Sequence, residues 1–336
     1  MNAITQAERS FDHEWGRIQN SAHQRTIARE LAHKRQLESV YVTSLHQLSD
    51  SEFLIGAFVP QSNQYINDMR LGPQDVTLSL VEIGRQIGIA VSHEFLGVPH
   101  GHAFILDDMR FEPMPAWHSI DWRTAERLWV HMTVRDCKLG AEHELVSVRA
   151  EGTFYVGEQC VCRQSSGWTV QPQHRYLRLR ELARLRHVRR PPVPQGDEPP
   201  LAGGFRVRAH ASAARAVIED TLWVSRTDHS FVGTLRVERD NRFFFDHQND
   251  HVPGLLVLEG MRRLALDVAS RYRRYDGEAL LREMEVDFTS FAELDCPVYL
   301  TARPAGQPDV MGPPERLHVE ARQGERLVAS SRFLMA

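Results

Sequence analysis

The stretch LVEIGRQIGIAVSHEF, from Leu80 to Phe95, has a second version later in the chain, VLEGMRRLALDVASRY, from Val257 to Tyr272. The two align without a gap, and each carries a glutamate followed three residues later by an arginine. Both are apolar around most of their circumference, which indicates a central helix that other elements cover on nearly every side. The sequence therefore predicts two copies of one domain, with central helices over Val76 to Leu96 and Leu255 to Tyr272.

The repeat extends outward from these helices. FLIGAFV, from Phe53 to Val59, aligns with FVGTLRV, from Phe231 to Val237, and Phe111 aligns with Phe288. Alternating apolar residues predict strands around each helix. They cover Ser39 to Pro60, Ala103 to Pro113, Arg127 to Lys138 and Glu144 to Cys162 in copy one, and Val217 to Phe245, Leu281 to Phe291, Val298 to Arg303 and Leu317 to Met335 in copy two. This is an α+β layout with one helix per antiparallel sheet.

The boundary between the copies lies in RRPPVPQGDEPPLAGG, where proline and glycine exclude a regular element. A chain of 336 residues also suits two domains. We expect a helical N-terminal extension over residues 1–35, packed outside the first core, and a first domain over 36–187. A linker over 188–204 and a second domain over 205–336 complete the predicted organisation.

Composition excludes several classes of protein. The formal net charge of −4 gives no basis for nucleic-acid binding, and we interpret the Arg-rich stretch His174 to Arg190 as a solvated helix. No stretch reaches the roughly 18 apolar residues of a membrane span, and the N-terminus lacks a secretory signal, so we expect a cytoplasmic location. The cysteines fit neither a disulfide framework nor a zinc site and are predicted to be free thiols. They are Cys137, Cys160, Cys162 and Cys296.

The segment NRFFFDHQNDHVPGLLVLEGMRRLA, from Asn241 to Ala265, combines two histidines, a Pro-Gly turn and a helix that opens with a glutamate. The predicted layout resembles the hotdog fold, in which a long helix lies in the concave face of an antiparallel sheet and two units pair edge to edge. The segment is similar to the thioester dehydratase branch of hotdog proteins. That similarity implies His247 or His251 as the catalytic histidine and Glu259 as the catalytic carboxylate.

Both copies together resemble the A-factor biosynthesis (AfsA-type) family of γ-butyrolactone signal synthases. The resemblance rests on GRQIGIAVSHEFLGVPHGHAFIL, from Gly84 to Leu106, and FFFDHQNDHVPGLLVLEGMRR, from Phe243 to Arg263, and covers nearly the whole chain from about Arg35. It implies a tandem (double) hotdog fold and an acyltransferase. The expected reaction condenses a β-ketoacyl thioester, on acyl carrier protein or coenzyme A, with dihydroxyacetone phosphate or a similar hydroxyketone. The product would be a butyrolactone or furan signal precursor, and no cofactor or metal is implied.

Ester formation from a thioester needs a base for the attacking hydroxyl and donors for the carbonyl oxygen. Glu82, Glu259 or a histidine is the candidate base, and the helix that follows Pro253 has N–H groups for the oxygen. A phosphate would suit a guanidinium. The candidates for binding the substrate and its phosphate are Arg85, Gln86, Arg262, Arg263 and Gly254. For each Glu/Arg pair, the alternative is an intrahelical salt bridge without a chemical role.

The two copies are not equivalent. Copy one has Met69 where copy two has His247. By resemblance to paired hotdog dehydratases, His247 would act with Glu82 across the interface between the copies, whereas Glu259 would face Met69. We therefore expect one complete site and one altered site.

Two other readings of the sequence stay open. One is a hotdog dehydratase or thioesterase that acts on the same kind of thioester, and the other is a non-catalytic module that binds an acyl ligand or docks its carrier. Homodimer formation is also left open. His93, His100 and His102 are expected to serve structural or turn roles near the end of the first helix.

Overall fold

The computed structural model describes residues 22–61, 76–125, 127–188, 204–208, 217–219, 221–225, 227–272, 279–305 and 315–336. The predicted linker lies outside these ranges except for its two end residues, and Met69 also lies outside them.

The described strands form one antiparallel sheet of 13 strands in the order β1-β2-β4-β5-β6-β3-β10-β13-β12-β11-β9-β8-β7. Copy one contributes β1 (Val42–Gln47), β2 (Glu52–Phe58), β3 (Ala103–Pro113), β4 (Arg127–Leu139), β5 (Leu145–Val156) and β6 (Gln159–Gln171). Copy two contributes β7 (Phe205–Arg208), β8 (Thr221–Val224), β9 (Phe231–Thr234), β10 (Leu281–Phe288), β11 (Tyr299–Pro304), β12 (Arg316–Gln323) and β13 (Arg326–Met335). Outward from the β3–β10 pair, the order is β3, β6, β5, β4, β2, β1 in copy one and β10, β13, β12, β11, β9, β8 in copy two, so the two halves correspond strand for strand. Copy two has β7 as an additional strand at its edge.

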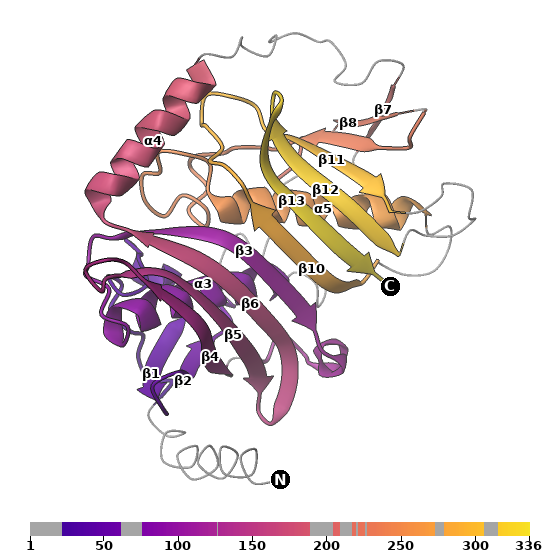
Figure 1. The fold of residues 1–336 in the computed structure, drawn as a ribbon. Coiled ribbons are helices and arrows are strands. Elements are labelled where there is room, and N and C mark those ends of the chain that lie inside the picture. The colour runs from indigo at the N-terminus through magenta and orange to yellow at the C-terminus, as the bar shows by residue number, and fades with distance from the viewer. Residues whose placement is uncertain are drawn as a thin grey trace.

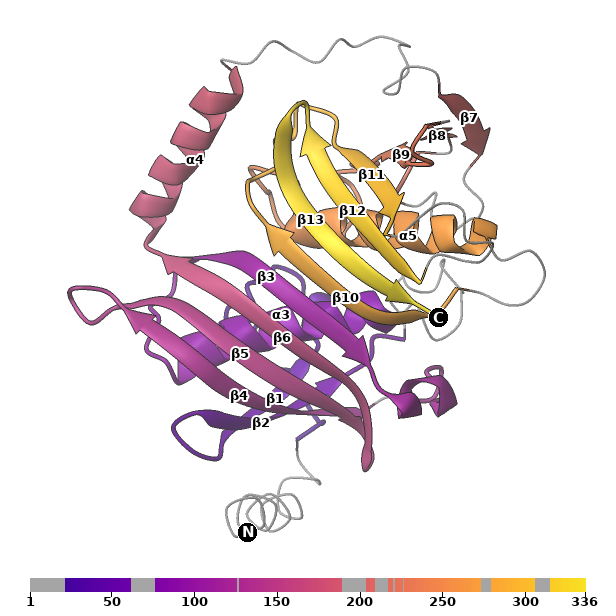
Figure 2. The ribbon, with the colours of Figure 1, turned by 45° about the vertical axis from the view of Figure 1, so that its right-hand side comes forward.

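The helices are α3 (Val76–Glu94) in copy one, α5 (Gly254–Tyr272) in copy two, and α4 (Gln173–Val188) after β6. Two short 3-10 helices, η1 (Leu37–Ser39) and η3 (Pro115–Ser119), lie in copy one. Figures 1 and 2 show α3 and α5 on the same side of the continuous sheet. The two central helices contact each other.

The two copies join where β3 pairs with β10, with Phe111 opposite Met284 and Asp108 opposite Asp287. This pairing covers a strand edge of each copy that would otherwise expose unpaired backbone groups. The predicted α+β double hotdog is therefore confirmed, and its internal interface is a strand pair inside one sheet (Figure 1).

The sheet of copy one wraps its helix. Fifteen of the 19 residues of α3 are buried. They pack in one apolar core with inward-facing side chains such as Phe53, Val130 and Phe154. Because so much of the helix surface is covered, the charged residues of α3 must either find partners or line an opening in the core.

Two of the predicted strands are hairpins. The stretch Glu144 to Cys162 contains the turn between β5 and β6, and Leu317 to Met335 contains the turn between β12 and β13. Gly157 and Gly324 occupy these turns with φ of 58° and 59°, a left-handed backbone that glycine adopts without strain. Apolar and polar residues alternate through both turns, so the pattern predicted one long strand in each place. The usual strand length of about 5–6 residues would have indicated a break.

The N-terminal extension is integrated into the first domain. Residues 22–35 form turns instead of the predicted helix. Ala22 and Ala32 are buried, and the N–H of Ile27 donates to the carbonyl of Val42 at the start of β1. Ala22 packs with Leu54 and Trp129 in a small cluster separate from the main core, in line with the predicted packing outside it, whereas Ile27 packs against the main core. Residues 1–21 lie outside the described part.

All four cysteines are free, as expected. Within the described ranges, no helix is both long and apolar enough to cross a membrane.

Candidate active site

Glu82 of α3 lies at the centre of a polar cluster. Its side chain is 1% exposed, and its Oε1 lies 2.9 Å from Lys34 Nζ and accepts a 2.9 Å hydrogen bond from Gln86 Nε2. Arg85 donates Nε and Nη2 to the two carboxylate oxygens, both at 2.8 Å. Burial alone would raise the pKa of Glu82, but the charges of Arg85 and Lys34 hold it well below its usual range. Glu82 is thus a fixed anion that orients the cations around it.

Arg85 is the member of this pair that faces outward. Its side chain is 32% exposed, whereas that of Glu82 is almost fully buried. Burial would lower the pKa of the guanidinium, but Glu82 and Asp246 raise it, so Arg85 is a permanent cation. One edge of the guanidinium is held by Glu82, and the other edge can receive an anion. A planar guanidinium has N–H donors on more than one edge, so it can bind two acceptors at once.

Gln86 lies behind this pair. Its Nε2 donates to the carbonyl of Ser39 at 2.8 Å as well as to Glu82, and its Oε1 accepts from the N–H of Tyr41 at 2.9 Å. The side chain is buried, and these bonds tie the segment before β1 to α3. We interpret Gln86 as a positioning residue, in place of the substrate-binding role predicted from the sequence.

A loop of copy two completes the cluster. Asp246 is buried and accepts hydrogen bonds from the backbone N–H groups of Arg35 at 2.6 Å and Gln36 at 3.3 Å. Its neighbour His247 is half exposed, with Nδ1 4.0 Å from Asp246 Oδ2. Burial and the charge of Arg85 lower the pKa of His247. His247 of copy two is therefore close enough to the Glu/Arg pair of copy one for the charge of Arg85 to act on it.

Sequence reasoning missed Lys34, which it placed in an outer extension. The lysine side chain is 7% exposed and reaches the carboxylate of Glu82 from the turn before η1. The available signal was the rarity of lysine. The chain is rich in arginine and has only two lysines, Lys34 and Lys138. Asp246 accepts a hydrogen bond from the N–H of Arg35, which fixes the backbone directly after Lys34 and places the lysine side chain beside Glu82.

The corresponding cluster of copy two is closed. Glu259 accepts hydrogen bonds from Arg262 at 2.7 and 2.8 Å and from Arg263 at 2.7 Å. The exposed fractions of the Glu259 and Arg262 side chains are 0%, and that of Arg263 is 5%. Burial would raise the pKa of Glu259, but the two arginines lower it. All three were predicted as site residues, and the structure places them in the core as a paired cluster without solvent access.

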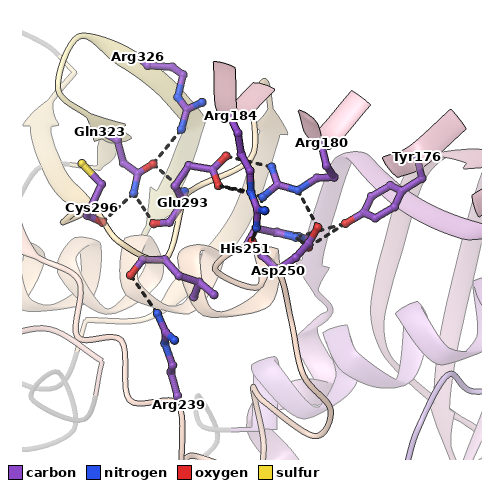
Figure 3. A network of polar contacts seen from close by, with 11 residues as sticks. Tyr176, Arg180, Arg184, Arg239, Asp250, His251, Glu293, Cys296, Gln323 and Arg326 are labelled. Carbon is purple, nitrogen blue, oxygen red and sulfur yellow. Dashed lines mark hydrogen bonds and ion pairs between the residues drawn. The ribbon is translucent and has the colours of Figure 1, made fainter. Parts of the chain in front are cut away.

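His251 belongs to a second polar network. Its Nδ1 lies 2.6 Å from Asp250 Oδ1, and its ring packs edge-on against Phe291. The hydroxyl of Tyr176 donates to Asp250 at 3.0 Å, as Figure 3 shows. These contacts link His251 to α4, and no described contact joins it to Glu82 or Glu259. The catalytic role of His251 therefore stays a prediction of the sequence.

Arg180 anchors this network. It is 3% exposed and donates to both carboxylate oxygens of Glu293, at 3.0 and 2.9 Å, and to Asp250 at 2.9 Å (Figure 3). Its guanidinium also lies 4.6 Å from the ring centre of Phe291. We call Tyr176, Arg180, Asp250, His251 and Glu293 the α4 clamp. The predicted solvated helix is exposed on its outer face, while the clamp fixes its inner face to the loop that carries His247.

The fold and the described residues define a class: a double hotdog protein with a partly exposed polar cluster on the central helix of one copy, near a loop of the other. Within that class, the family model for the A-factor biosynthesis hotdog domain, AfsA, matches residues 18–133 and 209–336. The chain belongs to this family, and the resemblance seen in the sequence is confirmed.

Relatives with assigned activities cover most of the chain. A 2-oxo-3-(phosphooxy)propyl 3-oxoalkanoate synthase of Streptomyces virginiae is 28% identical over 83% of this chain and 87% of its own length. A protein of the same name from Streptomyces griseus is 23% identical over 81% and 84%. Among solved structures, an acyl-ACP thioesterase from Bacteroides thetaiotaomicron aligns over 85% of this chain and 98% of its own, with 11% identity and a TM-score of 0.42.

Proposed function

We propose that this chain is an acyltransferase that joins a β-ketoacyl thioester to the free hydroxyl of dihydroxyacetone phosphate. The product would be a 2-oxo-3-(phosphooxy)propyl 3-oxoalkanoate, as the names of the Streptomyces relatives describe for those proteins. The observation that carries the proposal is the outward-facing guanidinium of Arg85, which Glu82 holds by one edge and the loop of copy two borders. This agrees with the acyltransferase predicted from the sequence.

Arg85 is our candidate for binding the phosphate. A phosphate dianion placed against its outer edge would accept parallel hydrogen bonds. Lys34, held by Glu82 below, adds a second positive charge to the same site. Burial lowers the pKa of His247 most, and the charge of Arg85 lowers it further, with smaller contributions from Lys34 and Arg35. Such a positive potential favours a phosphorylated substrate over its neutral analogue.

Glu82 is proposed as a positioning residue in place of the general base considered from the sequence. A carboxylate whose pKa lies far below neutrality takes up a proton poorly. Its oxygens are already occupied by Arg85, Lys34 and Gln86. The same argument weakens the dehydratase alternative, because dehydration needs a carboxyl group that exchanges protons with the substrate.

The thioester carbonyl is proposed to lie near His247. Because burial and nearby charge lower the pKa of His247, its imidazole is neutral near pH 7 and can donate one N–H to the oxygen as negative charge develops. Leu256 and Val257 donate their N–H groups to the carbonyl of Pro253, so the further candidate donors at the start of α5 are the N–H groups of Gly254 and Leu255. A Cβ at Gly254 would lie 3.4 Å from the ring of Phe288, an ordinary van der Waals contact, so packing alone does not require glycine there.

We further propose acyl carrier protein as the acyl donor. The outer face of α4 exposes Arg178 together with Leu177, Leu182 and Leu185, a basic and apolar surface that suits an acidic carrier. Homodimer formation and a cytoplasmic location stay predictions of the sequence.

The direct test is mass spectrometry of the purified chain with a β-ketoacyl thioester and dihydroxyacetone phosphate. We expect a condensed phosphoester that requires both substrates, and a higher kcat/KM for the carrier-protein thioester than for the coenzyme A thioester. Free acid alone would favour a thioesterase, and tight acyl binding without turnover would favour the non-catalytic module.

Replacing His247 with alanine is expected to lower kcat/KM by about 10²-fold, since loss of one oxyanion donor costs about 10²- to 10³-fold. His251→Ala is the matched comparison, because this second histidine lies in the α4 clamp. We expect His251→Ala to lower the thermal unfolding temperature and to change kcat/KM by less than about threefold. Equal rate losses in the two variants would contradict the assignment of His247.

A further inference from the structure

A hollow lies inside copy one, between α3 and the strands β4, β5 and β6. Its empty space is about 300 Å³, counting the part that is open to solvent. The helix side is formed by Gly84, Ile87 and Gly88, and the strand side includes Ala150 and Gly152. Small residues on both walls leave a narrow, mostly apolar space, which suits a slender ligand such as an alkyl chain.

One polar side chain lines this hollow without a partner. Gln164 of β6 is 7% exposed, and its Oε1 is buried and has no hydrogen-bond partner among the described residues. A buried amide oxygen without a partner costs free energy, so stability does not explain Gln164. A half turn of the amide exchanges its oxygen and nitrogen with little change in shape, so the same place can present an N–H donor. The hollow therefore combines apolar walls with one group that can hydrogen-bond a ligand.

Gly84 makes room for this glutamine. A Cβ at position 84 would lie 2.5 Å from both Nε2 and Oε1 of Gln164, so any other residue there would force the glutamine to move. Glycine inside a helix is also less stable than alanine. Copy one thus has a destabilising residue on its central helix beside an amide that has no partner.

Copy two has different residues at both positions. Its central helix has Met261 at the place of the glycine. On the strands of copy one, Phe111 pairs with Gln164. The aligned Phe288 of copy two pairs with Ala329. Because Met261 and Ala329 are both fully buried, the fold accommodates a large side chain on the helix and a small one on the strand. The glycine and the glutamine are therefore not requirements of the fold.

The hollow adjoins the candidate phosphate site around the helix. Gly84 directly precedes Arg85, and Gly88 follows it by three residues. Since each residue turns an α-helix by about 100°, Arg85 lies about 100° from Gly84 and about 60° from Gly88. The partly exposed guanidinium and the hollow thus lie on neighbouring faces of α3, both in copy one.

We propose that this hollow binds the acyl chain of the thioester and that Gln164 recognises the 3-oxo oxygen of that chain. This rests on the proposed function. With the amide turned so that Nε2 faces the ligand, an N–H of Gln164 donates to the ketone oxygen while the alkyl tail lies against the apolar walls. A saturated chain leaves the amide unpaired, which corresponds to about 5- to 150-fold weaker binding. Gln164 determines specificity and takes no part in proton transfer.

Gln164→Met tests the recognition of the 3-oxo group, because methionine keeps the length of the side chain and removes the amide. Calorimetric titration without dihydroxyacetone phosphate compares 3-oxooctanoyl-coenzyme A with octanoyl-coenzyme A. We expect the wild type to bind the 3-oxo chain at least about fivefold more tightly, and Gln164→Met to bind the two within about twofold of each other. The unfolding temperature of the variant should not fall, because Gln164 Oε1 has no hydrogen bond to lose.

Gln323→Met is the matched control in copy two. Gln323 is also buried, but its Nε2 donates to the carbonyls of Glu293 and Cys296, and its Oε1 accepts from the N–H of Glu293. This variant should unfold at a lower temperature and keep the wild-type preference for the 3-oxo chain. An equal loss of preference in Gln323→Met and Gln164→Met would contradict a specific role of Gln164.

Exchanging residues between the copies tests the hollow itself. Gly84→Met together with Gln164→Ala gives copy one the pair that copy two accommodates in its core. We expect this double variant to remain folded and to bind both thioesters at least about tenfold more weakly, because methionine occupies the space of the chain. A folded double variant with wild-type affinity would mean that the hollow holds only water, and would overturn the proposal.

Phosphoester formation separates this proposal from the proposed function. If the wild type forms phosphoester and Gln164→Met keeps the preference for the 3-oxo chain, the acyl site is overturned and the acyltransferase stands. If the wild type binds the 3-oxo chain through Gln164 but forms no phosphoester, the acyltransferase is overturned and the acyl site stands. Neither binding nor phosphoester would overturn both.

Discussion

Replacing Arg85 with methionine is expected to lower kcat/KM for dihydroxyacetone phosphate by about 10²- to 10⁴-fold. The guanidinium would donate two charge-assisted hydrogen bonds to the phosphate, each of about 1.5–3 kcal/mol, and about 1.4 kcal/mol corresponds to a factor of ten. Methionine keeps most of the length of the side chain and removes the cation. Initial rates of thiol release from the acyl thioester provide the measurement.

Two comparisons separate phosphate binding from general damage. Dihydroxyacetone lacks the phosphate, so the preference of the wild type for the phosphorylated substrate should largely disappear in Arg85→Met. Arg262→Met changes the equivalent residue of copy two, which is fully buried, and should lower stability while the folded fraction keeps its substrate preference. If Arg85→Met kept the wild-type preference for dihydroxyacetone phosphate over dihydroxyacetone, Arg85 would not be the residue that binds the phosphate.

Replacing Arg180 with methionine is expected to lower the free energy of unfolding by about 3–5 kcal/mol, the typical cost of removing one partner from a buried ion pair. Glu293 is only 4% exposed and would lose both hydrogen bonds from the guanidinium, and Asp250 would lose another. Urea unfolding followed by circular dichroism measures the change.

Arg175→Met is the control on the same helix. Arg175 is 55% exposed and lies 3.7 Å from Glu144, a surface pair expected to contribute less than about 1 kcal/mol. Adding Glu293→Gln to Arg180→Met should recover part of the loss, because it removes the unpaired charge. A loss below about 1 kcal/mol for Arg180→Met alone would mean that the α4 clamp does not stabilise the fold.

The repeat made the architecture predictable from the sequence. The two central helices align without a gap, with Glu82 opposite Glu259, which predicts the same fold twice. The apolar character of each helix predicts a sheet around it. Two hairpin turns escaped because a single glycine interrupts each long alternation, at Gly157 and Gly324. Periodicity reports which face of a strand is buried but says little about where a strand reverses.

The site was harder to predict than the fold. The sequence shows that Glu82 and Glu259 are equivalent by ancestry, but only packing shows that Arg85 reaches solvent while Arg262 does not. Lys34 escaped because contacts between residues far apart in the chain, such as its ion pair with Glu82, leave no local pattern. His93 was expected to have a structural or turn role, and its Nδ1 lies 2.8 Å from the carbonyl oxygen of Val98 in the turn after α3.

The pairing of β3 with β10 inside one chain has an evolutionary consequence. In a symmetric homodimer every substitution occurs twice, so both sites must change together. Joining the copies in one gene removes that restriction, and each copy can accumulate its own mutations. Selection can then preserve position 82 for its chemistry and position 259 for its packing, although both descend from one ancestral codon.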